Sequence, residues 1–567
     1  MKNFEIAKIL RTIALYLKMK DVPFKPQAYE KAAYSIESLE EDLEDFIKKN
    51  GEEKLKEISG IGESIAKKII EYLKTGKIKE LEKLKKEIPV DIETLTSLEG
   101  IGPKIVYKLY KTLKIKDIKD LEKACLEHKI RKLPGFGEKS ENKIIQSINL
   151  FKKETGRFIL GFVMPIVEEL ILFLKDSKYV SQISPAGSYR RKKETIGDID
   201  ILVTSSNKEK VIKHFLTFKE IDHIYAKGET KAMIRLKNGL DVDLRVVEKE
   251  SFGAALLYFT GSKDHNIAIR EIAIKKGYKL NEYGLFDKNN KIIAAKTEEE
   301  IYEKLGLQFI PPEIRENQGE IEAAKENKIP KLIEYGSIKG DLQIQTDWSD
   351  GQDSIEKMAK KAIELNLKYI CITDHTKSLA ITGGLDEKKI LKQMKEIDKL
   401  NSKFKGKIKI LKGSEVNILK DGSLDIKDEI LAKLEFVGVA IHSHFDLPKN
   451  IQTERIKKAL ANPHVDCLFH PTGRIINKRP AYEIDIDEII EFAKKNNKIL
   501  EIDAYPNRLD LKDEHIKKCV KKDVKMIIDS DAHSINHLHF LDLGISQARR
   551  GWATKKNILN TQDEFKI

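Results

Sequence analysis

The strand-like stretch GDIDILV, residues 197–203, constrains the fold most, because it sets two acids in an otherwise apolar run. Alternate residues of a β-strand point to the same face, so Asp198 and Asp200 are expected to project together. Two carboxylates on one face repel each other unless cations hold them. The stretch therefore predicts a cation-binding strand.

A second stretch, DVDLRVV at 241–247, closes a predicted strand hairpin and offers Asp241 and Asp243 on one side. Three carboxylates that converge from two adjacent strands would form a site for two Mg²⁺ ions. One ion would lower the pKa of an attacking hydroxyl, and the other would steady the leaving oxygens.

The segment GSYRR, residues 187–191, lies ahead of the acidic pair. A Gly-Ser turn that opens a helix supplies backbone donors for a triphosphate, and arginine adds charge on the same anion. Gly-Ser followed some ten residues later by Asp-apolar-Asp is the signature of a nucleotidyltransferase. The alternative is a strand edge with solvated aspartates.

The first 150 residues read as helices only, and they contain a threefold repeat. Each copy is a Gly-apolar-Gly turn followed by an amphipathic helix, which presents free backbone N–H groups suited to a phosphodiester backbone. A single copy could be an ordinary helix C-cap, but three copies resemble helix-hairpin-helix DNA-binding motifs. The predicted DNA-binding glycines are Gly60, Gly62, Gly100, Gly102, Gly135 and Gly137.

The bulk composition adds modest constraints. The net charge is +13 and the pI is near 9.0, which favours a polyanionic partner, although a general lysine bias would give the same surplus. The four cysteines are far apart and form no CxxC pair, which argues against disulfides or a cysteine zinc site. No apolar run reaches membrane-spanning length, so a cytoplasmic protein is expected.

The segments GSYRRKKETIGDIDILV, VDLRVV and YFTGSKDHNIAIREIAIKKGYKLNEYGLF closely resemble the family X DNA polymerases. With the helical N-terminus and repeated βα units from residue 337 onward, the chain is similar to the bacterial and archaeal branch that carries a polymerase and histidinol phosphatase (PHP) domain. The resemblance implies a multi-domain fold: an all-α helix-hairpin-helix domain (1–90), fingers (91–154), an α/β nucleotidyltransferase palm (155–249), a thumb (250–315), a linker (316–336) and a (β/α)7-like PHP barrel (337–567).

The resemblance also assigns roles to residues of the polymerase half. It implies gap filling in base excision repair, with gapped or primer-template DNA and dNTPs as partners, two Mg²⁺ or Mn²⁺ ions as cofactors, and a monomer. The metal-binding aspartates would be Asp198, Asp200 and Asp243, the last preferred to Asp241. The nucleotide would be bound by Gly187, Ser188, Arg191, Tyr258, Phe259, Gly261, Asn266 and Arg270.

A lyase activity is a further candidate at the N-terminus. Lys68 aligns with the lysine that family members with 5′-deoxyribose-phosphate lyase activity use as a Schiff-base nucleophile. That chemistry needs an amine with a depressed pKa. The same helix carries Lys67 and Lys74, and most helix lysines are solvated or touch phosphate. A companion lysine of the family is Ser64 here.

In the PHP region the resemblance implies three metals at the strand ends. One would be bound by Asp350, His375 and His533, and another by Glu415, His442 and His470. The first metal of the family would take Glu415, Asp531 and an H-x-H pair, which here is Gln343 and Gln345, the outward-pointing pair of the stretch DLQIQ. Amide oxygens are neutral, hard and weak ligands. Fewer than three Mn²⁺ or Zn²⁺ ions, and a weakened 3′–5′ exonuclease, are therefore expected.

Two other functions compete with gap filling. The chain could be mainly a metal-dependent nuclease that processes abasic sites, or a DNA-binding scaffold with a retired PHP domain. Both are disfavoured because the palm aspartates are complete while the nuclease ligands are not.

Overall fold

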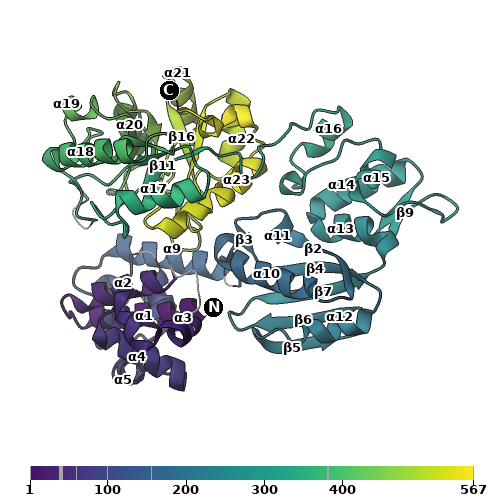
Figure 1. The fold of residues 1–567 in the computed structure, drawn as a ribbon, viewed down its shortest axis with the longest axis horizontal. Helices are drawn as coiled ribbons and strands as arrows, with labels where there is room; N and C mark the ends of the chain where they lie inside the picture. Colours follow the sequence, from purple (N-terminus) through teal and green to yellow (C-terminus); the bar gives the residue numbers. More distant parts are fainter. Residues whose placement is uncertain are drawn as a thin grey trace. The chain divides into compact units, whose positions relative to one another are not determined.

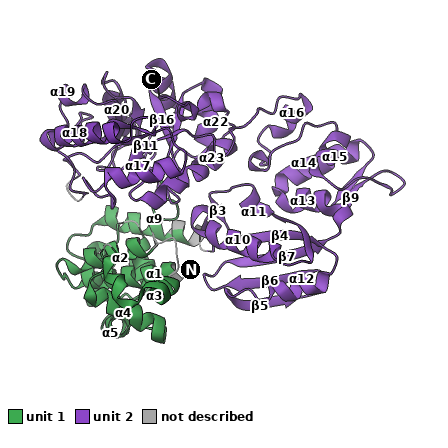
Figure 2. Cartoon of the chain, viewed as in Figure 1, with its two compact units in different colours: residues 1–155, 475–480 green, residues 156–474, 481–567 purple. Residues whose placement is uncertain are grey.

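A computed structural model describes residues 2–37, 43–58, 60–98, 100–154, 156–379 and 382–565. The chain divides into two compact units, one of residues 1–155 with 475–480 and the other of residues 156–474 with 481–567 (Figure 2). Within the described ranges no helix combines the length and the apolar character needed to cross a membrane.

The first unit is helical, as the sequence predicts, and it has one core to which Ile13, Leu55 and Leu109 contribute. Its amphipathic helices turn their apolar residues toward this core and their charged residues outward. The elements are α1 (Lys2–Met19), α2 (Lys25–Glu37), α3 (Leu43–Asn50), η1 (Glu52–Glu57), α4 (Glu63–Thr75), α5 (Lys79–Glu87), α6 (Ile92–Ser97), α7 (Pro103–Leu113), α8 (Ile118–Leu126), η2 (Ile130–Lys132) and α9 (Glu138–Glu154).

The second unit begins with a mixed α/β region built on a five-stranded sheet of order β2-β4-β7-β6-β5 (Figure 1). β4 and β7 are parallel neighbours, while the other pairs are antiparallel. The elements are β1 (Phe158–Ile159), α10 (Leu160–Lys175), β2 (Val180–Pro185), α11 (Gly187–Arg190), β3 (Thr195–Ile196), β4 (Asp198–Ser205), α12 (Lys208–Phe215), β5 (Ile221–Lys227), β6 (Lys231–Leu236) and β7 (Asp241–Val247).

The thumb region follows with a small antiparallel sheet of order β10-β9-β8. Its elements are η3 (Lys249–Ser251), α13 (Phe252–Thr260), α14 (Lys263–Lys275), β8 (Lys279–Asn281), β9 (Gly284–Phe286), β10 (Ile292–Ala294), α15 (Glu298–Lys304), η4 (Pro312–Ile314) and α16 (Glu320–Lys325).

The stretch 316–336, expected to be a linker, differs from that expectation. It contains α16, and Ile321, Ala324 and Leu332 join the same hydrophobic core as Leu257 of α13. The polar residues that suggested a linker alternate with these apolar residues, so the segment is polar on average but amphipathic in pattern.

A buried ion-pair network joins α11 to the thumb region. Glu298 accepts two hydrogen bonds from Arg190, at 2.9 and 2.6 Å, and one from Arg315 at 2.5 Å. Burial acts to raise the pKa of Glu298, but Arg315 and Arg190 outweigh it and hold the pKa at about 2. The carboxylate therefore stabilises the folded state in its charged form.

Glu298→Gln is expected to lower the free energy of unfolding at pH 7 by about 3 kcal/mol, because the pKa of Glu298 is held at about 2. Because the folded-state pKa is depressed, this contribution is complete above about pH 4.5 and disappears as the pH falls toward 2. Chemical unfolding of both proteins across this range measures the difference. Glu299→Gln, an exposed neighbour on α15, is the control. A loss that does not shrink at low pH would contradict the assignment to charge.

The rest of the second unit is a parallel sheet of seven strands in chain order, β11 to β17. Ala532 bridges to Ile344 and its amide donates to Gln343 O, so β11 also meets the end of β17 and the sheet nearly closes into a barrel. The strands are β11 (Gly340–Ile344), β12 (Tyr369–Ile372), β13 (Lys409–Asn417), β14 (Phe436–Ala440), β15 (Cys467–Leu468), β16 (Ile499–Asp503) and β17 (Met526–Asp529).

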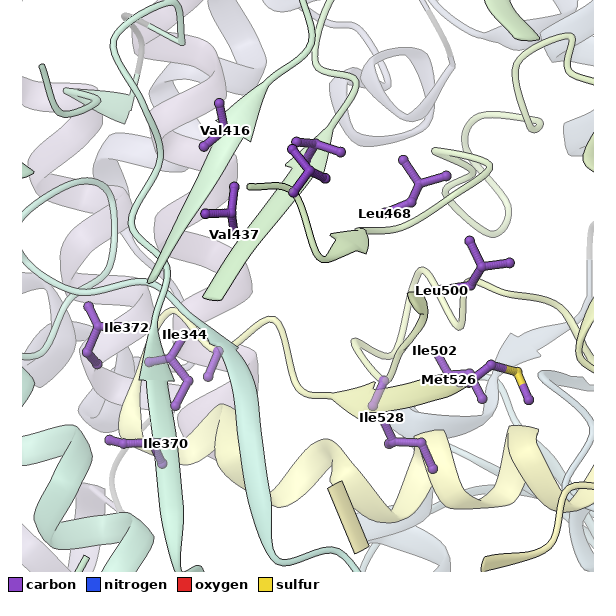
Figure 3. Packing of buried hydrophobic residues seen from close by; sticks show 14 of the residues in the cluster. Ile344, Ile370, Ile372, Val416, Val437, Leu468, Leu500, Ile502, Met526 and Ile528 are labelled. Atoms are coloured by element: carbon purple, nitrogen blue, oxygen red, sulfur yellow. The ribbon is translucent and has the colours of Figure 1, made fainter. Parts of the chain in front are cut away.

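Helices cover the outside of this barrel. Their apolar residues pack on the outward side chains of the strands, among them Ile370, Val437 and Ile528 (Figure 3). The inward face starts with an apolar floor that includes Phe436 and Phe469. The helices are α17 (Ile355–Glu364), α18 (Glu387–Lys403), α19 (Asp428–Leu431), α20 (Lys449–Leu460), α21 (Ile486–Lys495), α22 (Asp513–Lys522), η6 (Ile535–Phe540), α23 (Leu541–Arg550), η7 (Lys555–Asn557) and η8 (Leu559–Thr561).

Candidate active sites

The parallel register of β4 and β7 brings the palm carboxylates together. Asp198 lies opposite Asp241, and Asp200 lies opposite Asp243. Because all four occupy alternate positions, they share one face of the sheet. Asp198 is exposed, whereas Asp200 and Asp243 are half-buried.

The two aspartates of β7 differ in their partners. Asp241 is held by Arg235 through two hydrogen bonds of 2.8 and 2.9 Å. Asp243 has Lys231 at 3.1 Å and Arg245 at 3.3 Å on Oδ2, while its buried Oδ1 has no hydrogen-bond partner among the described residues. Asp243 thus has an oxygen available for a cation, and Asp241 is engaged elsewhere.

The surroundings of Asp200 perturb its pKa. Burial, Asp198 and Asp243 raise its pKa to about 6. A Cβ on Gly187 would lie 2.5 Å from Asp200 Oδ2, so the glycine lets the GSYRR turn approach the carboxylate. The crowded acids and the orphaned oxygen of Asp243 fit bound divalent cations, which would relieve the repulsion.

The two arginines of GSYRR have different surroundings. Arg190 is committed to Glu298 and Thr260. Arg191 donates from Nη1 to Thr260 O at 2.5 Å and from Nε to Glu316 at 3.2 Å. Glu316 was not identified from the sequence, since it lies in the presumed linker.

Four of the predicted nucleotide-contacting residues lie on α13 and α14, namely Tyr258, Phe259, Asn266 and Arg270. Tyr258 and Phe259 meet edge to face at the end of α13, and Arg245, which the sequence reasoning also missed, lies over the Phe259 ring. Asn266 donates to Tyr258 O at 2.7 Å, and Arg270 donates to Asn266 O at 3.2 Å. A small pocket is lined by Tyr258, Asn266 and Arg270 together with Leu280 and Asn281.

The three glycine turns of the first unit have the same geometry. The first glycine of each adopts a left-handed φ, of 80°, 79° and 81°. The apolar residue between the glycines donates its N–H to the carbonyl three residues earlier, and the second glycine directly precedes a helix. The helices that begin there are α4, α7 and α9, while two of the preceding segments are short 3₁₀ turns, η1 and η2.

The polar contacts of Lys68 disfavour the neutral amine that lyase chemistry needs. Its Nζ is 3.0 Å from Glu80 and 2.9 Å from Ser64 Oγ, and it lies over the Tyr29 ring. Partial burial acts to lower the pKa of Lys68, but the hydrogen bonds and charges of Tyr29 and Glu80 outweigh it, so the pKa is raised. A raised pKa keeps the amine protonated and unable to attack an aldehyde.

We expect that borohydride will trap no detectable adduct between the protein and an abasic 5′-end at neutral pH, because Lys68 is charged. Glu80→Gln removes the partner charge and is expected to increase trapping, if any amine of this site reacts. In that background, Lys68→Ala is expected to remove the trapping if Lys68 is the nucleophile. Lys67→Ala is the control, because Lys67 lies on the same helix but pairs with Glu63. Strong trapping by the unaltered protein would contradict the expectation.

The carboxyl ends of the barrel strands gather the predicted PHP ligands. Asp350, His375 and His533 offer ligand atoms within 4.8 Å of one another. His533 Nδ1 donates to Asp531 O at 2.8 Å, which leaves Nε2 facing Asp350 at 3.7 Å. One carboxylate and two imidazoles fit Zn²⁺ or Mn²⁺.

Glu415 is the centre of the second group. His442 Nε2 and His470 Nε2 lie 3.0 and 2.9 Å from its Oε1, and His375 Nδ1 lies 3.2 Å from its Oε2. Burial acts to raise the pKa of Glu415, but the surrounding imidazoles lower it well below its usual range. Asn417 orients His442 through Nδ1, so Nε2 is directed at the carboxylate. This group also fits a cation.

The glutamine pair differs from the expected outward orientation. Gln343 and Gln345 are fully buried. Gln345 Nε2 donates to Glu415 Oε2 at 2.9 Å, whereas Gln345 Oε1 and both amide atoms of Gln343 have no partner among the described residues. The alternation of DLQIQ shifts at the end of β11, where the register to β12 is irregular.

The first-metal position therefore does not fit a cation well. Gln345 presents an N–H donor, not a lone pair, to Glu415. Asp531, the other predicted ligand, has Arg508 Nε at 3.5 Å, and Arg508 also lies 3.4 Å from Asp503. Arg508 and Asp503 were missed because neither stands in a motif of ligand residues.

Comparison with protein families matches regions of the chain between residues 1 and 504. The family described as DNA polymerase beta palm matches residues 166–253, and DNA polymerase beta thumb matches 255–316. The PHP domain family matches 341–504. A helix-hairpin-helix domain matches 1–78, and a SAM-like helix-hairpin-helix tandem matches 92–149.

Individual relatives agree with these matches. The DNA polymerase/3′-5′ exonuclease PolX of Bacillus subtilis (strain 168) is 40% identical over 99% of this chain and 98% of its own length. A probable phosphatase of Acetivibrio thermocellus is 29% identical over 32% of this chain and 73% of its own. A probable phosphatase of Thermoanaerobacter sp. (strain X514) is 30% identical over 37% of this chain and 84% of its own. Because the Bacillus relative is 40% identical over nearly the whole chain, and palm, thumb and PHP families match in turn, the chain belongs to the family X DNA polymerases that carry a C-terminal PHP domain.

Proposed function

We propose that this protein fills short gaps in DNA during repair, adding dNTPs to a primer 3′-end by two-metal nucleotidyl transfer. The observation that carries the proposal is the β4–β7 register, in which Asp200 and Asp243 are direct neighbours and Asp198 lies on the same face. The palm relationship and the Bacillus relative named as a DNA polymerase support it.

In this proposal the primer 3′-hydroxyl attacks the α-phosphate of the dNTP and pyrophosphate leaves. Bound Mg²⁺ or Mn²⁺ supplies activation of the hydroxyl and neutralisation of the leaving oxygens. Asp198, Asp200 and Asp243 hold the cations, and Ser188 and Arg191 hold the triphosphate. Catalysis of this kind is mostly positioning and charge neutralisation.

The remaining residues orient the nucleotide and the DNA. Tyr258, Phe259 and Gly261 pack on the nucleotide sugar, and Asn266 and Arg270 face the minor groove of the new base pair. The three glycine turns bind phosphodiester backbones without reading bases, so the affinity for DNA falls steeply with salt. The protein acts on gapped DNA as a monomer.

Primer extension on DNA with a one-nucleotide gap, in Mg²⁺ or Mn²⁺, tests the proposal. The unaltered protein is expected to add one nucleotide, and the double variant Asp198→Ala, Asp200→Ala is expected to add none. Equal extension by both proteins would exclude the palm as the active site.

A second function, 3′–5′ exonuclease action by the PHP domain, is favoured by the two ligand groups around Asp350 and Glu415. The Bacillus relative is named as an exonuclease as well as a polymerase. We propose that this activity is weak here, because Gln343 and Gln345 leave the first-metal position with only Glu415 and Asp531 as strong ligands. Two Mn²⁺ or Zn²⁺ ions per chain are expected in this domain.

A further inference from the structure

Side chains of the PHP domain form hydrogen bonds to the palm loop that carries Arg191, the arginine proposed to bind the triphosphate. Arg474, at the end of the HPTGR segment, forms two hydrogen bonds to Glu194, at 3.1 and 2.7 Å. Arg550 of α23 donates to the backbone carbonyl of Arg191 at 2.9 Å. The loop is therefore fixed at two points three residues apart by side chains of another domain.

The side chain of Arg191 is fixed through the same contact. Glu316 Oε1 accepts from Arg191 Nε at 3.2 Å and from Arg550 Nη1 at 3.2 Å, and Lys193 Nζ lies 3.7 Å away. Glu316 thus separates two guanidinium groups that would otherwise repel each other. The exposed fractions of the two arginine side chains are 13% and 4%, so little solvent screens these charges.

Arg550 is itself held in place. Its Nη2 donates to Asp513 at the start of α22 at 2.5 Å, and its Nη1 also reaches Glu313 O at 3.2 Å. Close packing supports the contact, because a Cβ on Gly161 of α10 would lie 2.6 Å from Leu543 of α23. The guanidinium group of Arg550 is therefore held by the barrel through one nitrogen and contacts the palm through the other.

We infer that Arg550, acting with Glu316, is a positioning residue for the nucleotide site, so that the PHP domain helps to hold Arg191 for the dNTP triphosphate independently of any nuclease activity. The inference rests on the proposed polymerase function. Removing one partner of a buried charge network leaves the others uncompensated, and small displacements of a phosphate-binding group are costly.

Affinity for a labelled dNTP at gapped DNA with a dideoxy-terminated primer tests the inference, because no bond forms in that complex. Arg550→Lys is expected to weaken dNTP binding about 10-fold or more, since lysine keeps the charge but loses the planar fork. Glu316→Gln, which lies outside the barrel, is expected to do the same. Binding of the DNA itself is expected to stay within about twofold.

Arg549→Lys is the matched control. Arg549 is the preceding residue of α23 and also pairs across the same boundary, with Glu313 at 2.8 Å and Ile333 O at 2.7 Å, but no contact with Arg191 involves it. Its dNTP affinity is expected to match the unaltered protein. Equal weakening by Arg549→Lys and Arg550→Lys would indicate general loosening of the domains and would overturn the inference.

A double-variant cycle separates positioning from stability. In an Arg191→Ala background, Arg550→Lys is expected to have no further effect on dNTP affinity, because the residue that it positions is gone. Additive losses would overturn the inference. If the unaltered protein binds no dNTP at gapped DNA, the proposed polymerase function is wrong. If it binds dNTP and neither Arg550→Lys nor Glu316→Gln weakens the binding, only the positioning role is wrong.

Discussion

Asp243→Asn is expected to lower the rate of primer extension by about 10³-fold or more, whereas Asp241→Asn is expected to leave it within about threefold. The two residues are on the same face of the same strand and differ in their surroundings. Asp243 faces Asp200 and has a buried oxygen that no described residue contacts by a hydrogen bond, and Asp241 is paired with Arg235. Only the first substitution removes a carboxylate that a cation can use.

Single-turnover extension on a one-nucleotide gap, with the DNA pre-bound, measures both rates without interference from product release. Affinity for the gapped DNA is the control, since neither aspartate belongs to the glycine turns. If Asp241→Asn were the more damaging variant, the assignment of the third carboxylate would be wrong. Similar losses in both variants would instead make Asp241 part of the site as well.

Restoring histidine at both glutamine positions is expected to increase Mn²⁺-dependent shortening of DNA 3′-ends by about 10–100-fold, the range seen when even an outer-shell partner of a metal is changed. In the present chain Gln345 donates to Glu415, and the amide atoms of Gln343 are buried without partners. Histidine imidazoles at these two positions would replace the amide N–H donors and weak amide oxygens with nitrogen ligands. The metal content of the purified protein is expected to rise from two ions per barrel toward three.

Three further variants sharpen this experiment. Gln345→His alone is expected to give part of the gain, because it also frees Glu415 from the amide. Adding His375→Ala to the double histidine variant is expected to abolish the activity, since His375 contacts both Asp350 and Glu415. Asp198→Ala, Asp200→Ala in the same background is expected to leave 3′-end shortening intact. An unchanged metal content together with an unchanged rate would contradict the ligand assignment.

Local patterns in the sequence predicted the parts of the site that depend on a short stretch of chain. Period two in GDIDILV placed Asp198 and Asp200 on one face, and the repeated glycine turns predicted three equivalent helix starts. Both follow from backbone geometry within a few residues. The parallel direction of the β4–β7 pair could be known only from the structure, because a helix and two other strands separate the two strands in the chain.

Contacts between distant segments could not be predicted in this way. The pairing of Glu316 with Arg550 joins residues 234 positions apart, and neither stands in a motif. The burial of Gln343 accompanies an irregular register at the end of β11, which an alternation of apolar and polar residues does not reveal. Strand β15 has only two residues, too few for a periodic signal.

The arginine contacts between barrel and palm also bear on how this chain can be divided. The matched families end and begin at residues 253, 255, 316 and 341, and the PHP match ends at 504, well before α23. A fragment cut at any of these limits after the palm would lose the partner of Glu194 or of Glu316. The barrel is therefore expected to remain necessary for nucleotide binding although glutamines stand at two of its ligand positions. The limits of the matched families therefore do not coincide with the contacts that hold the palm loop.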